Sequence, residues 1–377
     1  MRRAEAVVDL DAIRDNVALL RSAAPSAALM AVVKADGYGH GLLPSARAAL
    51  DAGAGWLGVA VLEEALALRA AGITVPILSW LNVPGEPLAD GVAADVDLSV
   101  SAAWALAETV AAARAVGRPA RVHLKVDTGL ARNGATTADW PDLVAAAAAA
   151  QASGEIAVVG VWSHFAYADD PGHPTIARQV GVFLEALAVA KAAGLHPEVR
   201  HLANSAATLT LPAAHFDLVR PGIAVYGLSP VPQVSTYGLR PAMTLRGRVA
   251  LVKDVPAGIG VSYGHRYTTA ARTRLALVPM GYADGVPRAA TNAGEVWLGG
   301  RRRRISGTVC MDQFVVDVGV DVGDDAVEAG DEVVLFGPGD RGEPTAYDWA
   351  DTVDTIAYEI VTRIGVRVPR SYVGAGA

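Results

Sequence analysis

The sequence predicts an α/β protein, with an N-terminal (β/α)8 TIM-like barrel over residues 1–235 followed by a mainly β C-terminal domain over residues 236–377. Up to about residue 230, apolar strand-like runs alternate with alanine-rich helical stretches, and eight such pairs make a barrel. Beyond Pro230–Arg240, apolar and polar residues alternate between Gly-, Asp- and Asn-rich turns, which is typical of antiparallel strands. A chain of 377 residues has room for both parts. The alternation in the first part also fits a doubly wound sheet, so this alternative stays open.

The elements of the first part can be placed in order. Residues 10–22 carry Leu10, Ile13, Val17 and Leu20 at helical spacing. We expect barrel strands near 29–34, 56–60, 76–80, 95–100, 121–126, 157–163, 198–202 and 217–220. We expect helices between them at 43–52, 61–72, 101–116, 138–152 and 175–194, with shorter pieces near 86–91 and 205–211.

The second part contains strand-like runs and one late helical stretch. The runs are MTLRGRVALV, TRLALVPM, EVWL, QFVVDVGV and EVVLF, and the stretch from about Tyr347 to Gly365 is expected to be helical. Arg301–Arg304 follows Gly299 and Gly300, and we interpret it as the solvated shoulder of a hairpin.

Composition excludes several classes of function. With 52% hydrophobic and 19% charged residues the chain is globular, and its net charge of −7 gives no support for binding nucleic acid. The single Cys310 excludes an intrachain disulfide and a zinc site built from cysteines, and we expect no metal. The N-terminal residues lack an uninterrupted apolar segment, and no long apolar stretch follows. We therefore expect no signal peptide, no membrane contact and a cytoplasmic protein.

The stretch VKADGYGHG, which begins at Val33, stands out chemically. A buried strand ends in Lys34 and breaks at once into glycines. An uncompensated amine is expensive to bury, so Lys34 is exposed, paired with an acid or covalently occupied. The glycines permit close backbone approach, and Tyr38 adds a hydroxyl.

Polar side chains also occupy the ends of other predicted strands. In a barrel the carboxyl ends of the strands meet at one edge, where chemistry takes place. Each residue alone has an ordinary structural explanation, but their convergence indicates a site. They are Lys34, Lys125, His164, Asn204 with Ser205, and Arg220, with His201 just inside its strand.

The residues themselves indicate a phosphorylated ligand. Ser205 and the amides of Gly222 and Ile223 suit a phosphate, and Tyr38 can add a donor. An anion held beside a strand-end lysine suits pyridoxal phosphate, whose aldehyde forms a Schiff base with an amine. A sugar phosphate on a barrel aldolase is the alternative from these residues alone.

The chain resembles the alanine racemases over nearly its whole length. The matching stretches are VKADGYGHG, HLKVDTGLARNG, SHFAYADD, HLANSAA, VRPGIAVYGL, GVSYG, PMGYADGVPR, CMDQ and TIAYEI. The resemblance implies a barrel plus a β domain, to which the first strand, about residues 4–10, also contributes. It implies interconversion of L- and D-alanine by a homodimer, with two-base proton transfer at Cα of a pyridoxal 5'-phosphate aldimine, supplying D-alanine for peptidoglycan in cell wall biogenesis.

The same resemblance implies a role for each site residue. Lys34 would carry the cofactor, and Tyr263, supplied by the other subunit, would be the second catalytic base. Arg132 and the Met311 backbone would meet the substrate carboxylate and a cofactor oxygen. The cofactor's phosphate would be held by Tyr38, Ser205, Gly222, Ile223 and Tyr358, with Asn204 nearby, His164 against the ring and Arg220 at the pyridine nitrogen. Lys125 resembles a lysine that the family carbamylates. His164, Arg220 and His201 would be linked in a chain towards Tyr263.

Elementary chemistry agrees with this mechanism. Racemisation removes a proton from one face of Cα and returns it to the other, so two acid/base groups must flank one plane. A tyrosine titrates near pH ~10, so Tyr263 needs cationic neighbours to act as a base. Arg220 stays protonated and donates to the pyridine nitrogen, which should weaken the cofactor as an electron sink and limit transamination.

The chain departs from the common family pattern in two places, and three rival functions stay open. Asp36 and Gly37 vary the loop beside Tyr38. Thr308 stands where many members have an arginine lining the substrate's access path, so Asp169 and Arg288 can be paired differently there. A pyridoxal-phosphate-binding regulatory protein resembles the barrel half only. A barrel-plus-β decarboxylase would carry a glutamate in the place of Arg220. A racemase of wider substrate range is the third rival, although Tyr263, Tyr282 and Tyr358 favour a small substrate.

Overall fold

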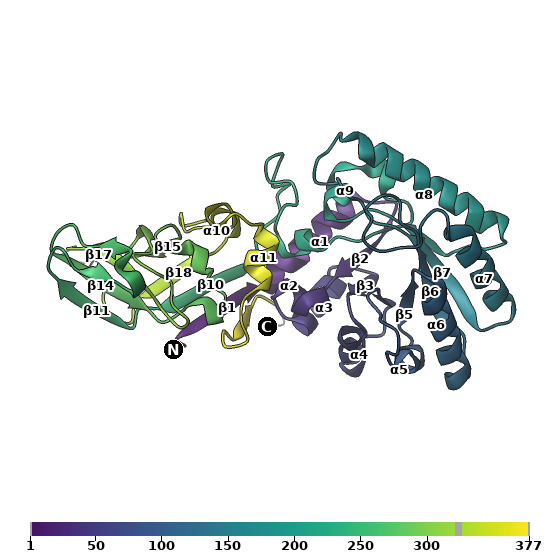
Figure 1. Cartoon of the computed structure of the whole chain (residues 1–377), viewed down its shortest axis with the longest axis horizontal. Helices are drawn as coiled ribbons and strands as arrows, with labels where there is room; N and C mark the ends of the chain where they lie inside the picture. Colours follow the sequence, from purple (N-terminus) through teal and green to yellow (C-terminus); the bar gives the residue numbers. More distant parts are fainter. Residues whose placement is uncertain (1, 321–325, 376–377) are drawn as a thin grey trace. The chain divides into compact units, whose positions relative to one another are not determined.

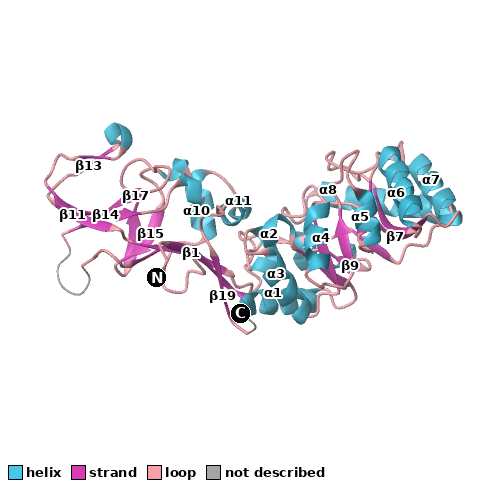
Figure 2. Cartoon of the chain, turned by 90° about the horizontal axis from the view of Figure 1, so that it is seen from below, coloured by secondary structure: helices cyan, strands magenta, loops and turns pink. Residues whose placement is uncertain are grey.

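The structure, a computed structural model, describes residues 2–320 and 326–375. It contains two compact units, which we describe separately. The barrel unit comprises Ile13–Gly37 and Leu42–Leu239, and the β unit comprises Met1–Ala12, Tyr38–Gly41 and Arg240–Ala377. Helices surround the strands of the barrel unit, whereas strands dominate the β unit (Figures 1 and 2).

Eight parallel strands form the barrel. Their order is β8-β7-β6-β5-β4-β3-β2-β9, so the first barrel strand, β2, also pairs with the last, β9. Backbone bonds from Asp217 N to Arg200 O (3.1 Å) and from Arg220 N to Ala203 O (2.9 Å) bridge β8 and β9, which nearly closes the barrel. The strands are β2 (Ala28–Val32), β3 (Trp56–Val59), β4 (Ile77–Ser79), β5 (Asp97–Val100), β6 (Ala120–Lys125), β7 (Ile156–Trp162), β8 (Val199–His201) and β9 (Leu218–Val219).

The barrel helices lie where the alanine-rich stretches predicted them. Both the predicted strands and the predicted helices of this part begin and end within about two residues of the observed ones. The helices are α1 (Leu10–Ala23), α3 (Leu42–Asp51), α4 (Leu62–Ala70), α5 (Leu88–Ala93), α6 (Ala103–Val116), α7 (Trp140–Ala152), α8 (Pro174–Ala192) and α9 (Ser205–Thr210).

The barrel interior is partly apolar and partly polar. Met30, Trp56, Leu78, Val199 and Leu218, from five different strands, belong to one buried cluster. Side chains two residues apart share a face of a strand. On β6 this places Arg121, His123 and Lys125 in a row, and the last two are buried.

The described residues of the β unit form three sheets. The largest has the order β16-β15-β18-β10-β1-β19, the second β11-β14-β17, and β12 pairs with β13. Strand β1 pairs antiparallel with β10 and parallel with β19, so segments far apart in the chain share a sheet. The strands are β1 (Ala4–Asp9), β10 (Met243–Arg248), β11 (Leu251–Val255), β12 (Gly260–Val261), β13 (Tyr267–Thr268), β14 (Thr273–Val278), β15 (Glu295–Leu298), β16 (Arg301–Arg304), β17 (Phe314–Gly319), β18 (Glu332–Phe336) and β19 (Arg370–Val373). The predicted class, a TIM-like barrel followed by mainly β structure, is confirmed.

Two details differ from the sequence prediction. The late helical stretch is two helices, α10 (Ala346–Val353) and α11 (Ala357–Thr362), because α10 ends at Asp354 in the left-handed conformation (φ 56°). Gly299 and Gly300 have φ of 58° and 70° and form the two-residue turn of the β15–β16 hairpin, as expected. The arginine run after them is not wholly solvated, since Arg303 is buried and donates to the carbonyls of Leu298 and Val318.

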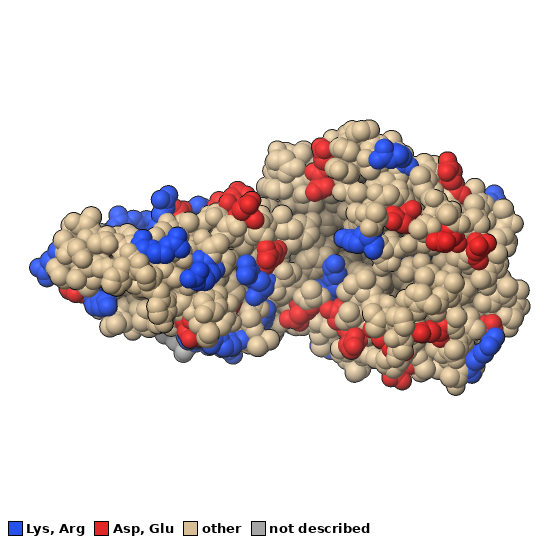
Figure 3. All heavy atoms as spheres, in the orientation of Figure 1, with Lys and Arg blue, Asp and Glu red and all other residues tan. Residues whose placement is uncertain are grey.

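Charge and hydropathy of the surface agree with the composition. On the face shown in Figure 3, basic side chains over the β unit are interspersed with acidic ones and do not form a continuous stripe. In the part of the chain that the structure describes, no helix combines the length and apolar character needed to span a membrane.

Candidate active site

Lys34 follows β2 and opens a left-handed turn. Residues 35–38, within α2 (Lys34–Tyr38), all have positive φ, between 52° and 60°. Apart from glycine, each such residue costs roughly 1–2 kcal/mol. Two carboxylates hold the turn: Glu64 accepts from the amide of residue 35 at 2.6 Å, and Asp36 accepts from the amide of Leu42 at 2.8 Å. The left-handed backbone is unfavourable by itself, and these hydrogen bonds stabilise it in a conformation that fixes the position of Lys34.

The Lys34 amine is partly desolvated. Its Nζ lies 5.9 Å from the centre of the Trp80 ring. Burial lowers the pKa of Lys34, the charge of Arg132 lowers it further, and Glu64 opposes the shift. A larger fraction of the amine is therefore unprotonated near neutral pH than in an exposed lysine, and this is the nucleophilic form.

A second lysine, Lys125, ends β6 and is buried. Its Nζ lies 4.0 Å from the centre of the Trp162 ring. Burial and the neighbouring charges of Arg220 and Arg132 lower the pKa of Lys125 to about 7. Such an amine is half neutral at physiological pH and open to modification.

Arg220 directly follows β9 and is a buried, positively charged residue at the carboxyl-terminal edge of the barrel strands. Its guanidinium donates to the carbonyl of Ser163 at 2.8 Å and lies 3.2 Å from His201 Nδ1 and 3.4 Å from His164 Nδ1. Burial lowers the pKa of Arg220 to about 9, which leaves the group charged at neutral pH. Burial, then the charge of Arg220, holds the pKa of both histidines well below the usual value, so both rings are neutral.

Below Arg220 the polar contacts continue into the barrel. His201 Nε2 lies 2.8 Å from Nδ1 of His123, and His123 Nε2 lies 3.1 Å from a carboxylate oxygen of Asp97. Asp97 also accepts from Arg121 at 2.6 Å. His201 was predicted from the sequence as a site residue, whereas His123 and Asp97 were not. Their signal was present, because His123 alternates with Arg121 and Lys125 on one strand and Asp97 opens the neighbouring strand.

Ser205 opens α9 and faces the segment after β9. Its Oγ accepts from the amides of Gly222 (2.8 Å) and Ala224 (3.4 Å), so its own proton can be donated outward. The Gly222 amide supports this hydroxyl, and Ile223 begins the short 3-10 segment Ile223–Tyr226. Asn204 is the N-cap of α9, since its side chain accepts from the amide of Ala207 at 3.0 Å.

Arg132 lies in the loop after β6. Asp127 shapes this loop by accepting, through one carboxylate oxygen, from the amides of residues 129, 130 and 131. Arg132 is exposed, and its charge lowers the pKa of Lys34, Lys125 and His164. The loop therefore carries an exposed positive charge that acts on both lysines of the strand edge.

The β unit holds the remaining predicted site residues. The rings of Tyr38 and Tyr358 lie side by side, 6.4 Å apart between centroids, and burial raises the pKa of Tyr38. Tyr263 lies in a 3-10 turn (Tyr263–His265) and is 76% exposed. Its carbonyl accepts from the Thr308 hydroxyl at 2.7 Å, and the Ser262 hydroxyl donates to the Thr308 carbonyl at 2.7 Å. Thr308 therefore fastens the turn that carries Tyr263.

The predicted residues thus form two groups. The barrel unit brings together Lys34, Lys125, Arg132, His164, His201, Asn204, Ser205, Arg220, Gly222 and Ile223 at one strand edge. The β unit carries Tyr38, Tyr263, Met311 and Tyr358. Among the described residues, no cluster of His, Cys, Asp and Glu is arranged to hold a metal ion.

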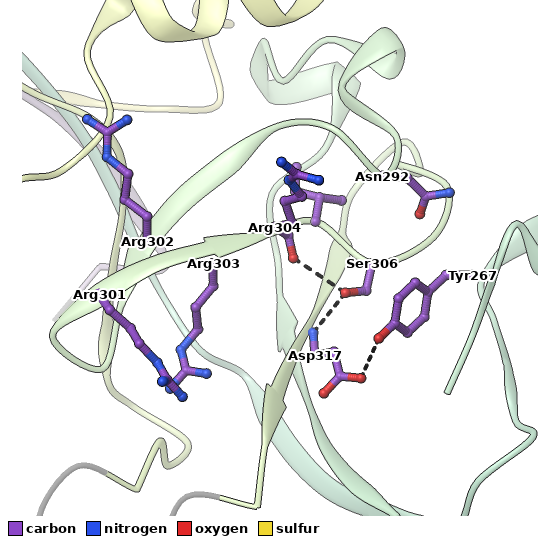
Figure 4. Close-up of a pocket in the computed structure, with 9 residues that line it drawn as sticks. Tyr267, Asn292, Arg301, Arg302, Arg303, Arg304, Ser306 and Asp317 are labelled. Carbon is purple, nitrogen blue, oxygen red and sulfur yellow. Dashed lines mark hydrogen bonds between the residues drawn. The ribbon is translucent and has the colours of Figure 1, made fainter. Parts of the chain in front are cut away.

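A hollow of about 460 Å³ beside the β15–β16 hairpin is the other conspicuous feature (Figure 4). Tyr267 donates to Asp317 there at 2.6 Å, and the amide of Asp317 donates to the Ser306 hydroxyl at 3.0 Å. The arginines alternate in direction along β16, and Arg302 is bound to backbone carbonyls and Asp348. These contacts stabilise the hairpin, and the Tyr267–Asp317 pair holds the hydroxyl proton more tightly, because burial and the carboxylate raise the pKa of Tyr267 to about 12.

Comparisons with known proteins agree with the geometry. Residues 8–230 match the family described as alanine racemase, N-terminal domain, and residues 242–372 match alanine racemase, C-terminal domain. The chain is 68% identical to the alanine racemase of Frankia casuarinae, over 98% of this chain and 96% of that one. It is 60% identical to that of Thermobifida fusca, over 99% and 98%.

Solved structures show the same likeness. One is the crystal structure of alanine racemase from D-cycloserine-producing Streptomyces lavendulae, with a TM-score of 0.97 and 60% identity, covering 100% of this chain and 98% of that chain. Another is alanine racemase from Streptomyces coelicolor A3(2), with a TM-score of 0.96 and 60% identity, covering 99% and 98%.

Proposed function

Because this chain belongs to the alanine racemase family, we propose that Lys34 and Tyr263 are the two acid/base groups with which it interconverts L- and D-alanine. The activity is that of an amino-acid racemase, and its product is D-alanine for peptidoglycan. The observation that carries the proposal is the Lys34 amine, half-buried and lowered in pKa at the strand edge that also holds Arg220. A neutral amine can take a proton from one face of Cα and return one to it.

The residues of the barrel fit pyridoxal 5'-phosphate, and we propose it as the cofactor, bound covalently to Lys34. The donor set supports this, because Ser205 has a proton left to offer an anion and Lys34 offers an amine to an aldehyde. Gly222 and Ile223 would support the phosphate with Tyr38 and Tyr358, Asn204 would lie nearby, and Arg220 and His164 would meet the ring. When bound, the cofactor acidifies the Cα–H bond by withdrawing its electron pair.

The substrate carboxylate would meet Arg132 and the Met311 backbone. Arg132 is exposed at the barrel edge, and Met311 is 53% exposed on the β unit, so both can be reached by a small ligand. A carboxylate held by a guanidinium keeps Cα in one place while the proton changes face.

We propose that Lys125 is carbamylated. In this reaction the neutral amine would add to the carbon of carbon dioxide, which forms an N–C bond and releases one proton to solvent. The pKa of about 7 supplies the neutral amine. The product is an anion flanked by Arg132 and Arg220, whose charges oppose the protonated amine and favour the carbamate.

We propose that the enzyme is a homodimer in which Tyr263 completes the partner's site. Tyr263, Tyr282 and Met311 are large, exposed and carried by loops that hydrogen bonds tie together, including Tyr282 N to Cys310 O at 3.0 Å. A contiguous exposed apolar patch is typical of an interface.

We further propose action in the cytoplasm, where a chain with one cysteine needs no oxidising compartment.

The test follows Cα–H exchange of each enantiomer of alanine in deuterated water, with and without added pyridoxal phosphate. Wild type should exchange and racemise both enantiomers only with the cofactor. Tyr263→Phe should slow exchange from one enantiomer far more than from the other, because only one of the two bases is lost. Equal slowing of both would contradict the assignment of a separate base to each face. Serine, run in parallel, tests the rival of wider substrate range.

A further inference from the structure

The polar chain inside the barrel extends well beyond the groups assigned above. It leads from Arg220 through His201 on β8 and His123 on β6 to Asp97 on β5, with heavy-atom distances of 3.2, 2.8 and 3.1 Å. All four residues are buried, and the two histidines and Asp97 are fully so. Only Arg121, which closes the chain on Asp97, is partly exposed.

The hydrogen bonds of this chain can all be satisfied only if each group donates towards Asp97. A guanidinium has donors and no acceptor, so the 3.2 Å contact between Arg220 and His201 forms only while His201 Nδ1 is bare. If the proton moved to Nδ1, the guanidinium would have to turn away from the ring. A neutral His201 then carries its proton on Nε2 and donates to His123 Nδ1. His123 in turn carries its proton on Nε2 and donates to the Asp97 carboxylate. Each ring is held in one tautomer by its neighbour.

The backbone makes room for this path. His123 and His201 lie on β6 and β8, so their contact passes the intervening strand β7 at Gly160. A Cβ at residue 160 would lie 2.2 Å from His123 Nδ1, so no larger residue fits there. The Trp162 ring stacks on His201 at 5.5 Å with 7° between the planes, and Arg220 lies over the same ring at 4.8 Å.

The far end of the chain carries a negative charge. Burial by itself would raise the pKa of Asp97, but hydrogen bonds from His123 and Arg121 outweigh it, and the pKa is lowered. A barrel interior filled with aliphatic side chains would avoid the desolvation of these groups. We therefore explain this buried polar network by its effect on Arg220, at the end of the chain opposite Asp97.

We propose that Asp97 and His123 are positioning residues for Arg220: the hydrogen-bond chain that starts at the Asp97 carboxylate fixes His201 Nδ1 as an acceptor, which orients the Arg220 guanidinium. The consequence for catalysis rests on the role proposed above for Arg220 against the cofactor ring. The tautomer assignment itself needs no cofactor.

The first test is therefore made on the cofactor-free full-length protein, labelled with 15N in its histidine rings. The nitrogen shifts should show His201 and His123 each protonated on Nε2 and bare on Nδ1. His123→Phe, which keeps a ring in place, should leave His201 as a mixture of tautomers. Asp97→Leu should do the same, and Asp97→Asn, which keeps an acceptor oxygen, should restore most of the bias.

The second test is made on the loaded enzyme and compares transamination with racemisation. His123→Phe and Asp97→Leu should raise that ratio several-fold, and Asp97→Asn should raise it less. Thr109→Val is the control for lost stability, because Thr109 is equally buried and donates only to Ala105 O within α6. It should leave the ratio unchanged.

Either of two results would overturn the inference. One is a wild-type His201 protonated on Nδ1. The other is a ratio in the His123 and Asp97 variants that equals that of Thr109→Val. If the tautomers are as stated but Arg220→Lys leaves the ratio unchanged, the role given to Arg220 fails and the chain remains as described.

Discussion

At the scale of single residues, lowered basicity is the common property of the site. Lys34 and Lys125 are both amines whose pKa falls because they are buried among arginines. The surplus of positive charge at this edge, from Arg132 and Arg220, suits ligands that bring a carboxylate and a phosphate. The same surplus has a cost for folding, because a protonated amine among arginines is unfavourable.

That cost predicts a pH-dependent stability for the unmodified protein. The pKa of Lys125 is about 7 in the folded chain and near 10.5 in the unfolded one, so between these values the unfolded chain binds the extra proton. Stability should therefore rise with pH through this window, by at most about 1.4 kcal/mol per pH unit. Urea unfolding in carbon-dioxide-free buffer at a series of pH values measures it. Lys125→Met should flatten the rise, and an identical slope in both proteins would contradict the shift.

Thr308 supplies a second prediction at this scale. Its buried hydroxyl holds the carbonyl of Tyr263, so Thr308→Val leaves that carbonyl without its donor and loosens the turn. We expect racemisation to fall about tenfold, corresponding to about 1.4 kcal/mol of lost positioning. Steady-state kinetics check this, with Thr308→Ser as the control that retains the hydroxyl. Should the serine variant be as slow as the valine variant, the hydroxyl is not responsible.

The position of a side chain at the strand edge was predictable wherever a predicted strand ended in a charged residue, as for Lys34, Lys125 and Arg220. His123 and Asp97 were not predicted, although the alternation of His123 with Arg121 and Lys125 marked its position. Their role depends on hydrogen bonds between different strands, which a local pattern does not reveal. Thr308 was noticed only as a departure from the family. Its bond to the Tyr263 carbonyl depends on two loops that meet only in the folded β unit.

At the scale of elements, the strands, the helices and the Gly299–Gly300 hairpin turn were predictable, whereas the left-handed turn after β2 was not. Apolar runs and alanine-rich stretches specified the barrel elements, because burial and helix propensity act locally. The left-handed turn after β2 was not foreseen beyond its glycines, since residues 35, 36 and 38 are not glycine. That turn is stabilised by a side chain distant in the sequence, because Glu64 accepts a hydrogen bond from the amide of residue 35.

Glu64 therefore links the turn to the chemistry of Lys34. Its carboxylate raises the pKa of Lys34 against the effect of burial, so Glu64→Gln should lower that pKa further. The pH profile of Schiff-base formation with pyridoxal phosphate, followed by absorbance, should shift towards lower pH. Glu63→Gln, on the exposed side of the same helix, is the matched control. A shift towards higher pH, or the same shift in the control, would contradict the role of Glu64.

At the scale of the whole molecule, the β unit carries the proposed second acid/base group, Tyr263, which lies outside the barrel unit. Tyr263 and Met311 are exposed on it, and β1 ties the start of the chain into its main sheet next to β10 and β19. The fold class was predictable from the change in pattern near residue 235. The proposal that a second copy uses the exposed Tyr263 came only from resemblance, because neither periodicity nor composition encodes an interface.

The shared site can be tested by mixing two inactive proteins. Lys34→Ala keeps a normal Tyr263, and Tyr263→Phe keeps a normal Lys34. If each site takes its lysine from one subunit and its tyrosine from the other, a mixed dimer contains one intact site and one doubly damaged site. Random reassembly makes half of the dimers mixed, so about one quarter of wild-type racemisation should return. Each variant mixed with itself is the control. If both bases came from the same chain, every site in the mixture would stay damaged and no activity would return.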